Sequence, residues 1–200
     1  MEPARSSYPA TFGFDPPEKV ANWRPLVNWL LAIPHYIVLY ALQILSEVVA
    51  LISWFVILFT GKMPESLANV QAMYLRYELR TYFFAGFLQE EYPPFAFTMS
   101  ANDTGEAQRL RVDFAPELEN RNRLTVAFRI ILIIPQVIVL AVLLIASSVV
   151  HLIAFFAVLF TGKWPEGMRT FVLNVYRWVL RVSAYATLLN DRYPPFAFEE

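Results

Sequence analysis

Two long apolar blocks dominate the pattern of hydrophobic and polar positions along the chain. One covers residues 34–60 and the other residues 135–161, and each closes on a Thr-Gly-Lys motif followed by a proline and a glutamate. A helix rises about 1.5 Å per residue, so about 20 apolar residues cross the ~30 Å hydrocarbon core of a bilayer. Both blocks are therefore predicted to be membrane helices that stop at a glycine turn. The residues of the two predicted turns are Thr60, Gly61, Lys62, Thr161, Gly162 and Lys163.

The apolar blocks belong to a longer internal repeat. Residues 34–65 recur at 135–166, displaced by 101 positions without a gap, and the match continues to the Tyr-Pro-Pro-Phe-Ala-Phe runs at 92–97 and 193–198. A repeat of this length indicates a duplicated structural unit. We divide the chain into a polar N-terminal segment (1–13), a first repeat (14–98), a polar linker (99–113) and a second repeat (114–200).

Short alternations of apolar and polar residues occur before and after the apolar blocks. Phe12 and Phe14 alternate with small or polar residues, and Leu110, Val112 and Phe114 do the same in the linker region. A period of two predicts half-buried strands. The proline pairs near the repeat ends block helix and lead into further alternations, at Phe95, Phe97, Met99, Phe196 and Phe198. We predict one small extramembrane β-sheet built from segments before and after each repeat.

A second, less apolar helix is predicted after each turn, at residues 65–88 and 166–189. If the strands form one sheet, both ends of each repeat lie on one side of the membrane, so each repeat crosses an even number of times. We therefore predict a mainly α-helical, polytopic membrane protein with two parallel helical hairpins and about four transmembrane helices. The alternative is a re-entrant hairpin with the arginine-bearing helix on the membrane surface. No glycine or proline lies in the middle of either block to turn such a hairpin, which counts against it.

The segment at residues 23–33 contains two tryptophans and an arginine and precedes a proline, which is typical of an interfacial elbow helix. A simple extension of the next helix is the alternative. Most arginines and lysines lie in the terminal and linker segments, and few lie near the Thr-Gly-Lys turns. By the positive-inside rule, the termini and the central linker are predicted to be cytoplasmic.

Composition also favours a membrane location and excludes several function classes. The chain is 57% hydrophobic and 16% charged, with a mean hydropathy of +0.43, whereas soluble domains carry about 25% charged residues. A net charge of −1 provides no basic field for nucleic acid, and the absence of cysteine excludes disulfides and thiolate chemistry. His35 and His151 lack partners at metal-ligand spacing, and the Thr-Gly-Lys motif lacks the upstream glycine of a P-loop. We expect no metal, no cofactor and no catalytic residue, and predict that the protein is not an enzyme.

Three runs carry a resemblance to a known family: PLVNWLLAIPHYIVL, WFVILFTGK and RWVLRVSAYATLLNDRYPPFAF. The chain resembles the bacterial integral-membrane family catalogued as domain of unknown function 4389, over residues 14–98 and again over residues 114–200. The first repeat departs from the family pattern in its second helix, where the arginine–tryptophan pair kept at Arg177 and Trp178 is replaced. The resemblance implies a location in the bacterial cytoplasmic (inner) membrane and two copies of one architecture, and it implies no reaction.

Ionisable residues at membrane depth are the main candidates for function. Counted from Gly61, Glu47 lies fourteen residues before and Arg76 fifteen residues after, so a helical hairpin places them at matching depth. One interpretation is a polar seam that conducts protons, ions or a solute. The other, which we favour because the seam is sparse, is a buried ion pair that fixes helix packing. The candidate seam consists of Glu47, Arg76, Arg80, His151, Asn174, Arg177 and Arg181.

These observations predict location more sharply than activity. We predict a multi-pass, non-catalytic membrane protein that serves as an accessory or scaffold subunit of a larger assembly. Its expected partners are the lipid bilayer and other membrane subunits or further copies of itself, and nucleic acid is not expected. The alternatives are a small transporter or channel-like protein that uses Glu47, Arg76 and Arg177, or a membrane-shaping hairpin protein.

Overall fold

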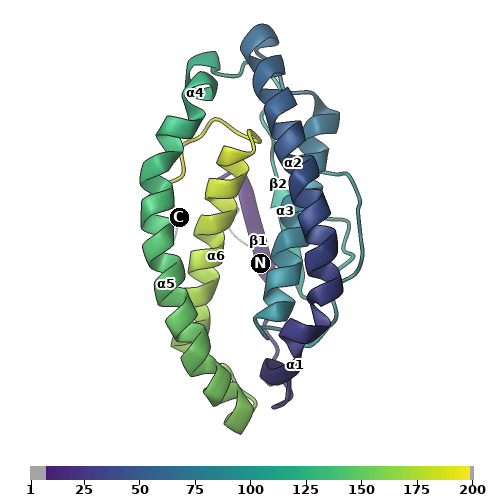
Figure 1. The fold of residues 1–200 in the computed structure, drawn as a ribbon, viewed down its shortest axis with the longest axis vertical. Coiled ribbons are helices and arrows are strands. Elements are labelled where there is room, and N and C mark those ends of the chain that lie inside the picture. The colour runs from purple at the N-terminus through teal and green to yellow at the C-terminus, as the bar shows by residue number, and fades with distance from the viewer. Residues whose placement is uncertain (1–7, 199–200) are drawn as a thin grey trace, which may run out of the picture.

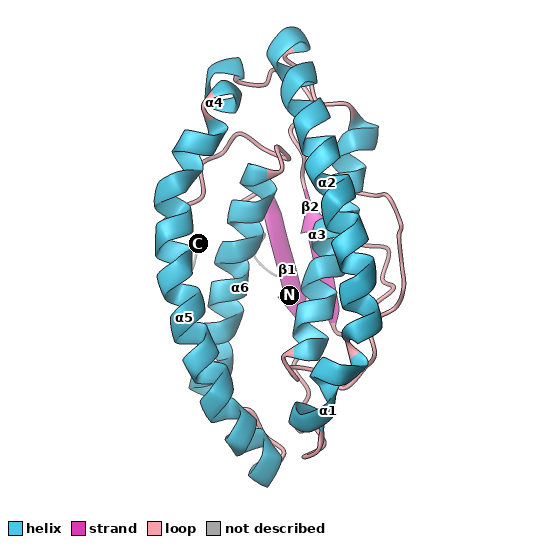
Figure 2. Cartoon of the chain, viewed as in Figure 1, coloured by secondary structure: helices cyan, strands magenta, loops and turns pink. Residues whose placement is uncertain are grey.

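The computed structural model describes residues 8–198, and most of this stretch is helical (Figures 1 and 2). In chain order the elements are β1 (Ala10–Phe14), α1 (Arg24–Leu31), α2 (Ile33–Thr60), α3 (Glu65–Ala85), β2 (Leu110–Phe114), α4 (Arg123–Ala127), α5 (Arg129–Thr161) and α6 (Glu166–Ala186). Each half contributes one strand, a short helix, a long apolar helix and a second helix of 21 residues. The mainly α-helical class and the duplication are therefore confirmed.

Each long apolar helix ends at the glycine of its Thr-Gly-Lys motif. Gly61 closes α2 with φ +72° and Gly162 closes α5 with φ +67°, a left-handed conformation that glycine adopts without a steric penalty. In each turn the threonine hydroxyl accepts a hydrogen bond from the lysine backbone N–H, at 3.2 Å and 3.1 Å. A proline then precedes the first residue of the next helix, which is a glutamate in both halves. The helix dipole favours negative charge at that place.

The tryptophan-rich segment before α2 forms the separate helix α1. Pro25 lies in the first turn of α1 and Pro34 in the first turn of α2, which are positions where proline costs no backbone hydrogen bond. Trp23 and Trp29 are 49% and 56% exposed. In the second half the short helix α4 ends at Ala127 and α5 begins at Arg129, so Pro135, the equivalent of Pro34, lies inside α5. The two halves therefore differ in how the short helix joins the long one.

The predicted sheet forms in part. β1 and β2 pair antiparallel, with Phe12 opposite Val112 at the centre of the register. The apolar residues of both strands are buried, apart from Phe14, which is partly buried. The rings of Phe12 and Phe14 contact the ring of Phe83 on α3, at 5.4 Å and 4.9 Å between centroids. The alternating pattern therefore identified these two strands correctly.

The runs after the proline pairs do not form strands, which corrects the prediction for Phe95, Phe97, Met99, Phe196 and Phe198. Two consecutive prolines lack the N–H groups that a ladder needs. The aromatic rings of these runs pack on helices instead. Phe95 stacks on His35 of α2, at 4.2 Å between ring centroids, and Phe97 stacks on Tyr77 of α3, at 5.5 Å. Each run therefore ties its own hairpin together.

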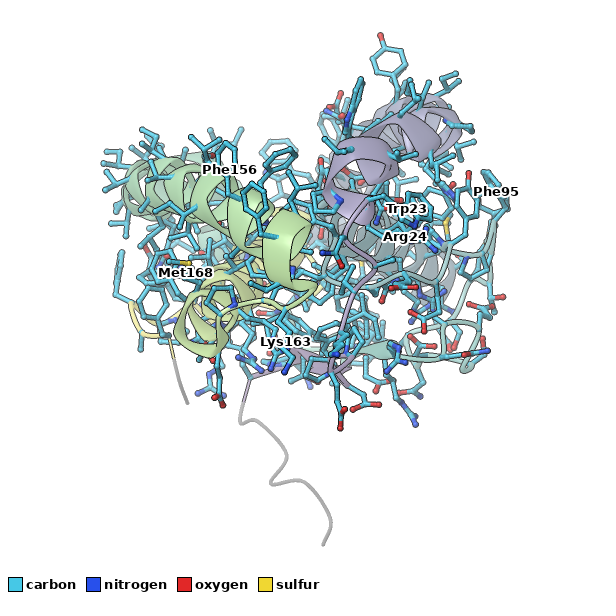
Figure 3. All side chains as sticks on the ribbon, turned by 90° about the horizontal axis from the view of Figure 1, so that it is seen from below. Trp23, Arg24, Phe95, Phe156, Lys163 and Met168 are labelled. Carbon is cyan, nitrogen blue, oxygen red and sulfur yellow. The ribbon has the colours of Figure 1, made fainter. Side chains whose placement is uncertain are left out.

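The elements form three layers. α2 packs on α3 and α5 packs on α6, while the inner helices α3 and α6 contact each other and the two strands. Seen along the molecule, α2 and α5 occupy one side and the strands the opposite side (Figure 3). Side chains on the outer helices are nearly all carbon in this view, whereas nitrogen and oxygen atoms gather on the strand side. The protein is thus a slab with one apolar and one polar face.

The two halves run in opposite directions, which corrects the predicted parallel hairpins. The backbone O of Gly61, after α2, accepts the N–H of Arg121 at 2.9 Å, and the O of Gly162, after α5, accepts the N–H of Val20 at 2.8 Å. The two turns therefore lie at opposite ends of the molecule, and α2 and α5 are antiparallel (Figure 1). Among the described helices, α2 and α5 are long and apolar enough to cross a membrane. α3 and α6 do not meet that criterion, so four membrane helices are not supported.

Candidate membrane-facing surface and groove

The outer faces of α2 and α5 form a large exposed apolar surface. In the most apolar 18-residue stretch of each helix, only 22% of α2 and 17% of α5 is buried inside the protein. The core helix of a soluble fold would be mostly buried. The exposed side chains include Ile37, Phe59, Ile130 and Phe160, each at least 68% exposed. A surface of this extent exceeds the apolar patches found on soluble monomers and requires an apolar environment or partner.

Few polar side chains interrupt this surface, and two pairs of them bond within their own helix. Gln43 donates to Glu47 at 3.0 Å, and the Ser148 hydroxyl donates to the Leu144 carbonyl at 2.8 Å. Both pairs are separated by four residues, so each lies on one helix face. Local pairing of this kind lowers the penalty of placing polar groups on an apolar surface.

The arginines of α3 point away from that surface, toward the linker. Arg76 donates from Nε to the Val112 carbonyl at 3.1 Å and from Nη2 to two carbonyls of the linker at 3.0 Å. Arg80 donates to both oxygens of Asp103, at 2.9 Å and 2.8 Å, and to Glu106 at 2.9 Å. The Asp103 side chain is fully buried and also lies 3.6 Å from Arg76 Nε. The two arginines therefore fasten the linker and β2 onto α3.

This geometry corrects the predicted pairing of Glu47 with Arg76. Glu47 is exposed on the outer face of α2 and accepts from Gln43, while Arg76 is bound by the linker on the other side of α3. The prediction assumed that polar residues of a hairpin face each other. In the structure α3 contacts α2 as well as α6 and β2, and its arginines bind β2 and the linker.

In the second half the remaining seam candidates also separate. Arg177 donates to Asn174 at 2.6 Å, and its guanidinium lies 5.2 Å from the centroid of the Phe12 ring on β1. Arg181 donates to the Ala197 carbonyl after the second proline pair. His151 lies elsewhere, with its ring 6.5 Å from that of Tyr176 on the groove side of α6. The seven candidates thus lie on the outer face of α2, at the linker, on the strand side of α6 and in the groove, and the contacts of the described residues do not join them into one seam.

A second buried ion cluster lies where the second half begins. Asp191 accepts from Arg121 at 2.7 Å and from the Asn122 backbone N–H at 2.7 Å, and Arg129 also contacts it at 2.5 Å. Burial raises the pKa of Asp191, but hydrogen bonds from Arg121 and Asn122 outweigh it and hold the pKa below its ordinary value. This carboxylate ties the end of α6 to the start of α4 and α5.

Each hairpin also carries a buried polar pair at equivalent positions. In the first half His35 Nδ1 lies 2.7 Å from the Tyr77 hydroxyl, and in the second half Trp178 donates to Gln136 at 2.8 Å. Gln136 also donates to the Pro194 carbonyl at 2.7 Å. Since the same contact is made by different residue types, this pair connects the two helices of each hairpin rather than supplying chemistry. His35 belongs to this pair and His151 does not.

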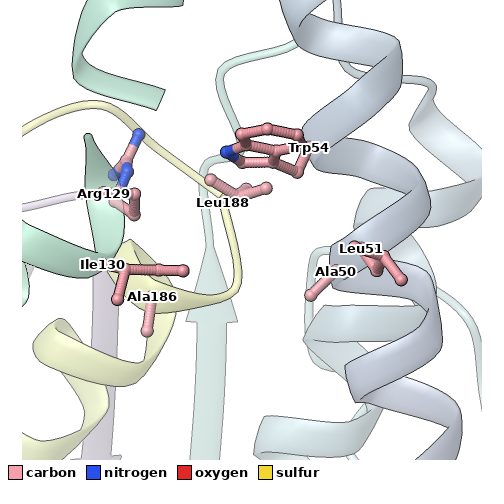
Figure 4. Close-up of a pocket in the computed structure, with 7 residues that line it drawn as sticks. All are labelled: Ala50, Leu51, Trp54, Arg129, Ile130, Ala186 and Leu188. Carbon is pink, nitrogen blue, oxygen red and sulfur yellow. The ribbon is translucent and has the colours of Figure 1, made fainter. Parts of the chain in front are cut away.

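A groove with two pockets runs between α2 and α5 and is floored by α3 and α6. One pocket, of about 340 Å³, is lined by α2 on one side and by the start of α5 and the end of α6 on the other (Figure 4). It is lined by Ala50, Leu51, Trp54, Arg129, Ile130, Ala186 and Leu188. The two Nη groups of Arg129 bond to the Tyr185 and Asn190 carbonyls and to Asp191, and the other six lining residues are alanine, leucine, isoleucine or tryptophan, so this pocket is mainly apolar.

The second pocket, of about 400 Å³, is polar. It is lined by Tyr36, Tyr82, Ala85, Gly86, Leu144, Ser147, Ser148, His151 and Tyr176. Beneath it a cavity of about 20 Å³ lies between α3 and α6, beside Glu78, and shares Tyr82 and Tyr176 with the larger pocket. The Tyr74 hydroxyl donates to Glu78 at 3.1 Å. Burial raises the pKa of Glu78 above its ordinary value, against the opposing effect of hydrogen bonds from Tyr74 and Tyr82.

Within residues 8–198 no group of three histidine, aspartate or glutamate side chains is arranged to hold a metal ion. The repeated unit of the chain is a helical hairpin with a short preceding helix and a proline pair at its end. A model of the family described as domain of unknown function (DUF4389) matches residues 22–96 and again residues 123–197. The chain belongs to this family. No curated protein and no solved structure matches it.

The two DUF4389 copies are alike in scaffold and unlike in the groove. Glu78 corresponds to Val179 in the second copy, and His151 corresponds to Ala50 in the first. Glu78, Asp103 and Asp191 are buried or partly buried carboxylates that were not predicted from the sequence. The signal available for Glu78 was its replacement by valine in the partner copy. No local pattern marks Asp103 as the partner of arginines that lie more than twenty residues before it.

Proposed function

We propose that this DUF4389 protein lies in one leaflet of a membrane, with its apolar outer helices in the hydrocarbon and its strand layer in water. There it acts as a non-catalytic accessory or scaffold protein. The observation that carries the proposal is the division of the slab into an apolar face, made by α2 and α5, and a polar face on the strand side (Figure 3). An amphipathic slab of this kind fits an interface between hydrocarbon and water.

Helix length supports an orientation along the membrane plane. The exposed apolar stretch of α5 from Ile130 to Phe160 is ~45 Å long at about 1.5 Å per residue, whereas the hydrocarbon core is ~30 Å thick. If α5 crossed the membrane along its axis, the strand layer beside it would lie at membrane depth. The side chains of Asp15 and Arg111 in that layer are 84% and 68% exposed, and such charges are costly in hydrocarbon.

Engineered single cysteines provide the test, because the chain contains no cysteine of its own. Lys62, Lys163 and Asn102 are exposed, and a cysteine at each should react with a membrane-impermeant maleimide from the same side of a vesicle. A cysteine at Ile138, which is 62% exposed on the apolar face, should stay unreactive and serves as the lipid-facing control. Since the two turns lie at opposite ends, crossing helices would place Lys62 and Lys163 on opposite sides, and that result would overturn the in-plane orientation.

The scaffold role is tested separately. The polar face presents exposed charged groups around β1 and β2, such as Arg111, where a partner in water has access. Purification in mild detergent should recover a second protein at fixed stoichiometry, and Arg111→Glu should reduce its recovery while Glu119→Gln, at an exposed surface pair, should not. A homogeneous monomer with no co-purifying chain would contradict the scaffold role and leave the orientation untouched.

A membrane-shaping role is the second candidate, and the slab geometry favours it over transport. Apolar helices that enter one leaflet expand that leaflet alone, which bends a bilayer. Transport by the predicted seam has lost its basis, because Arg76 is bound by the linker rather than paired with Glu47. Conversion of large vesicles into tubules or small vesicles by the purified protein would support membrane shaping.

A further inference from the structure

The polar pocket of the groove and the small cavity beside Glu78 are adjacent. Tyr82 and Tyr176 line both spaces, and Glu78 borders only the smaller one. Only these two tyrosines are shared between the larger pocket and the cavity of the partly buried carboxylate. The smaller cavity, of about 20 Å³, has room for one water-sized group.

The site offers mainly hydrogen-bond acceptors. A carboxylate has about four acceptor positions, and Tyr74 and Tyr82 are the hydrogen-bond donors to Glu78. His151 Nδ1 lies 2.9 Å from the Ser147 carbonyl, so Nδ1 carries the proton and Nε2 is an acceptor. No lysine or arginine is among the described residues that line either space. A cationic or hydrogen-bond-donating ligand therefore complements the site.

The fold itself does not require these polar groups. The pocket at the other end of the groove is apolar (Figure 4), and two of its lining residues, Ala50 and Ala186, correspond to His151 and Ala85 of the polar pocket. Tyr36 and Glu78 both correspond to valine in the other copy. Since the second copy forms the same hairpin with valine in place of Glu78, the partly buried carboxylate is better explained by a ligand than by stability.

We propose that this site binds the primary ammonium head group of an aminophospholipid, with the ammonium beside Glu78 and the acyl chains between α2 and α5. A primary ammonium brings three N–H donors to the acceptors, whereas a quaternary ammonium brings none. The faces of the surrounding tyrosine rings also favour a cation. The hydroxyls of Tyr36 and Tyr176 line the larger pocket and would donate to the phosphate. The proposal rests on the proposed contact of the apolar face with lipid.

Native mass spectrometry of the full chain in a neutral detergent tests the proposal. Phosphatidylethanolamine, phosphatidylcholine and phosphatidylglycerol with identical acyl chains are titrated, and the fraction of protein that carries one lipid is measured. Phosphatidylethanolamine should bind at a concentration about tenfold lower than the other two, the gain expected from one charge-assisted hydrogen bond. Glu78→Gln should abolish this preference, because it removes the negative charge and replaces one of the two acceptor oxygens by a donor. Glu119→Gln removes the same charge from the exposed surface and should change nothing.

Equal affinity for the three lipids would overturn the proposal, as would a folded Glu78→Gln variant that keeps the preference. If Glu78→Gln fails to fold, the variants Tyr36→Phe and Tyr176→Phe decide the matter, because each removes only a hydroxyl from the pocket lining and each should weaken phosphatidylethanolamine binding several-fold. Unchanged binding in both would then count against the site. The detergent assay does not depend on orientation, so its outcome and that of the cysteine labelling are independent.

Discussion

Replacement of Asp103 by asparagine tests whether the arginines of α3 hold the linker and the strand to the helical layer. The Asp103 carboxylate accepts from Arg80 at 2.9 Å and 2.8 Å and lies 3.6 Å from Arg76. It also accepts the backbone N–H groups of Val112 and Gly105, at 2.9 Å and 2.8 Å. One buried carboxylate thus connects a helix, the linker and β2.

The expected magnitude follows from what remains after the substitution. Asparagine keeps the shape of the side chain but turns one acceptor into a donor that faces other donors. Removal of one partner from a buried ion pair costs about 3–5 kcal/mol. Glu106 still pairs with Arg80 at 2.9 Å, and Arg76 keeps its carbonyl partners, so we expect the lower end, about 3 kcal/mol. In a chain of this size about 1 kcal/mol lowers Tm by ~2–4 °C, which predicts a decrease of roughly 6–12 °C.

The assay is thermal unfolding in a mild detergent, followed by circular dichroism. Glu119→Gln is the matched control, because Glu119 pairs with Lys62 at 2.7 Å while both side chains are 62% exposed. An exposed pair contributes about 0–1 kcal/mol, so this variant should melt within ~4 °C of the native chain. Equal melting of the Asp103 and Glu119 variants would refute the view that the buried cluster holds the linker in place.

Two further predictions concern a turn and a surface carboxylate. Gly61→Ala should lower the free energy of unfolding by about 1–2 kcal/mol, because φ is +72° there. Gly167→Ala, whose added Cβ meets no atom within 4 Å, should not lower it. Chemical denaturation measures both variants. Burial raises the pKa of Glu106, but hydrogen bonds from Thr98 and Arg80 outweigh it and lower the pKa from 4.5 to about 2. Its contribution to stability is therefore complete above pH 4.5 and lost as the pH falls toward 2, so Glu106→Gln should flatten the acid limb of a stability–pH curve.

The helices and their ends could be predicted because their signals are local. A long apolar block, a glycine after it and a proline–glutamate pair each act over a few residues, and the structure places the ends of α2 and α5 at Gly61 and Gly162. The strands β1 and β2 were likewise predictable from their alternation. The runs after the proline pairs show the same alternation although they are not strands. Phe95 packs on His35 of α2 and Phe97 packs on Tyr77 of α3.

The partners of the arginines could not be predicted, because they depend on which surface of α3 the linker covers. Depth counting compared Glu47 with Arg76 along a hairpin and carried no information on the direction in which either side chain points. The actual partners, such as Asp103, lie in a segment without periodicity. Glu78 was hidden for a similar reason, since the cavity beside it is lined by α3 and α6, which belong to different copies and meet only in the folded chain.

The direction of the strand pairing accounts for the whole slab. β1 and β2 pair antiparallel about Phe12 and Val112, and each strand leads into one copy of the same hairpin. Antiparallel strands therefore send the two copies in opposite directions, whereas the predicted parallel hairpins would have needed parallel strands. Because both copies pack their inner helix on the same strand layer, both outer helices must lie on the same side of it. A duplication of a one-sided hairpin thus produces a single continuous apolar face, and the groove lies along the line where the two copies meet.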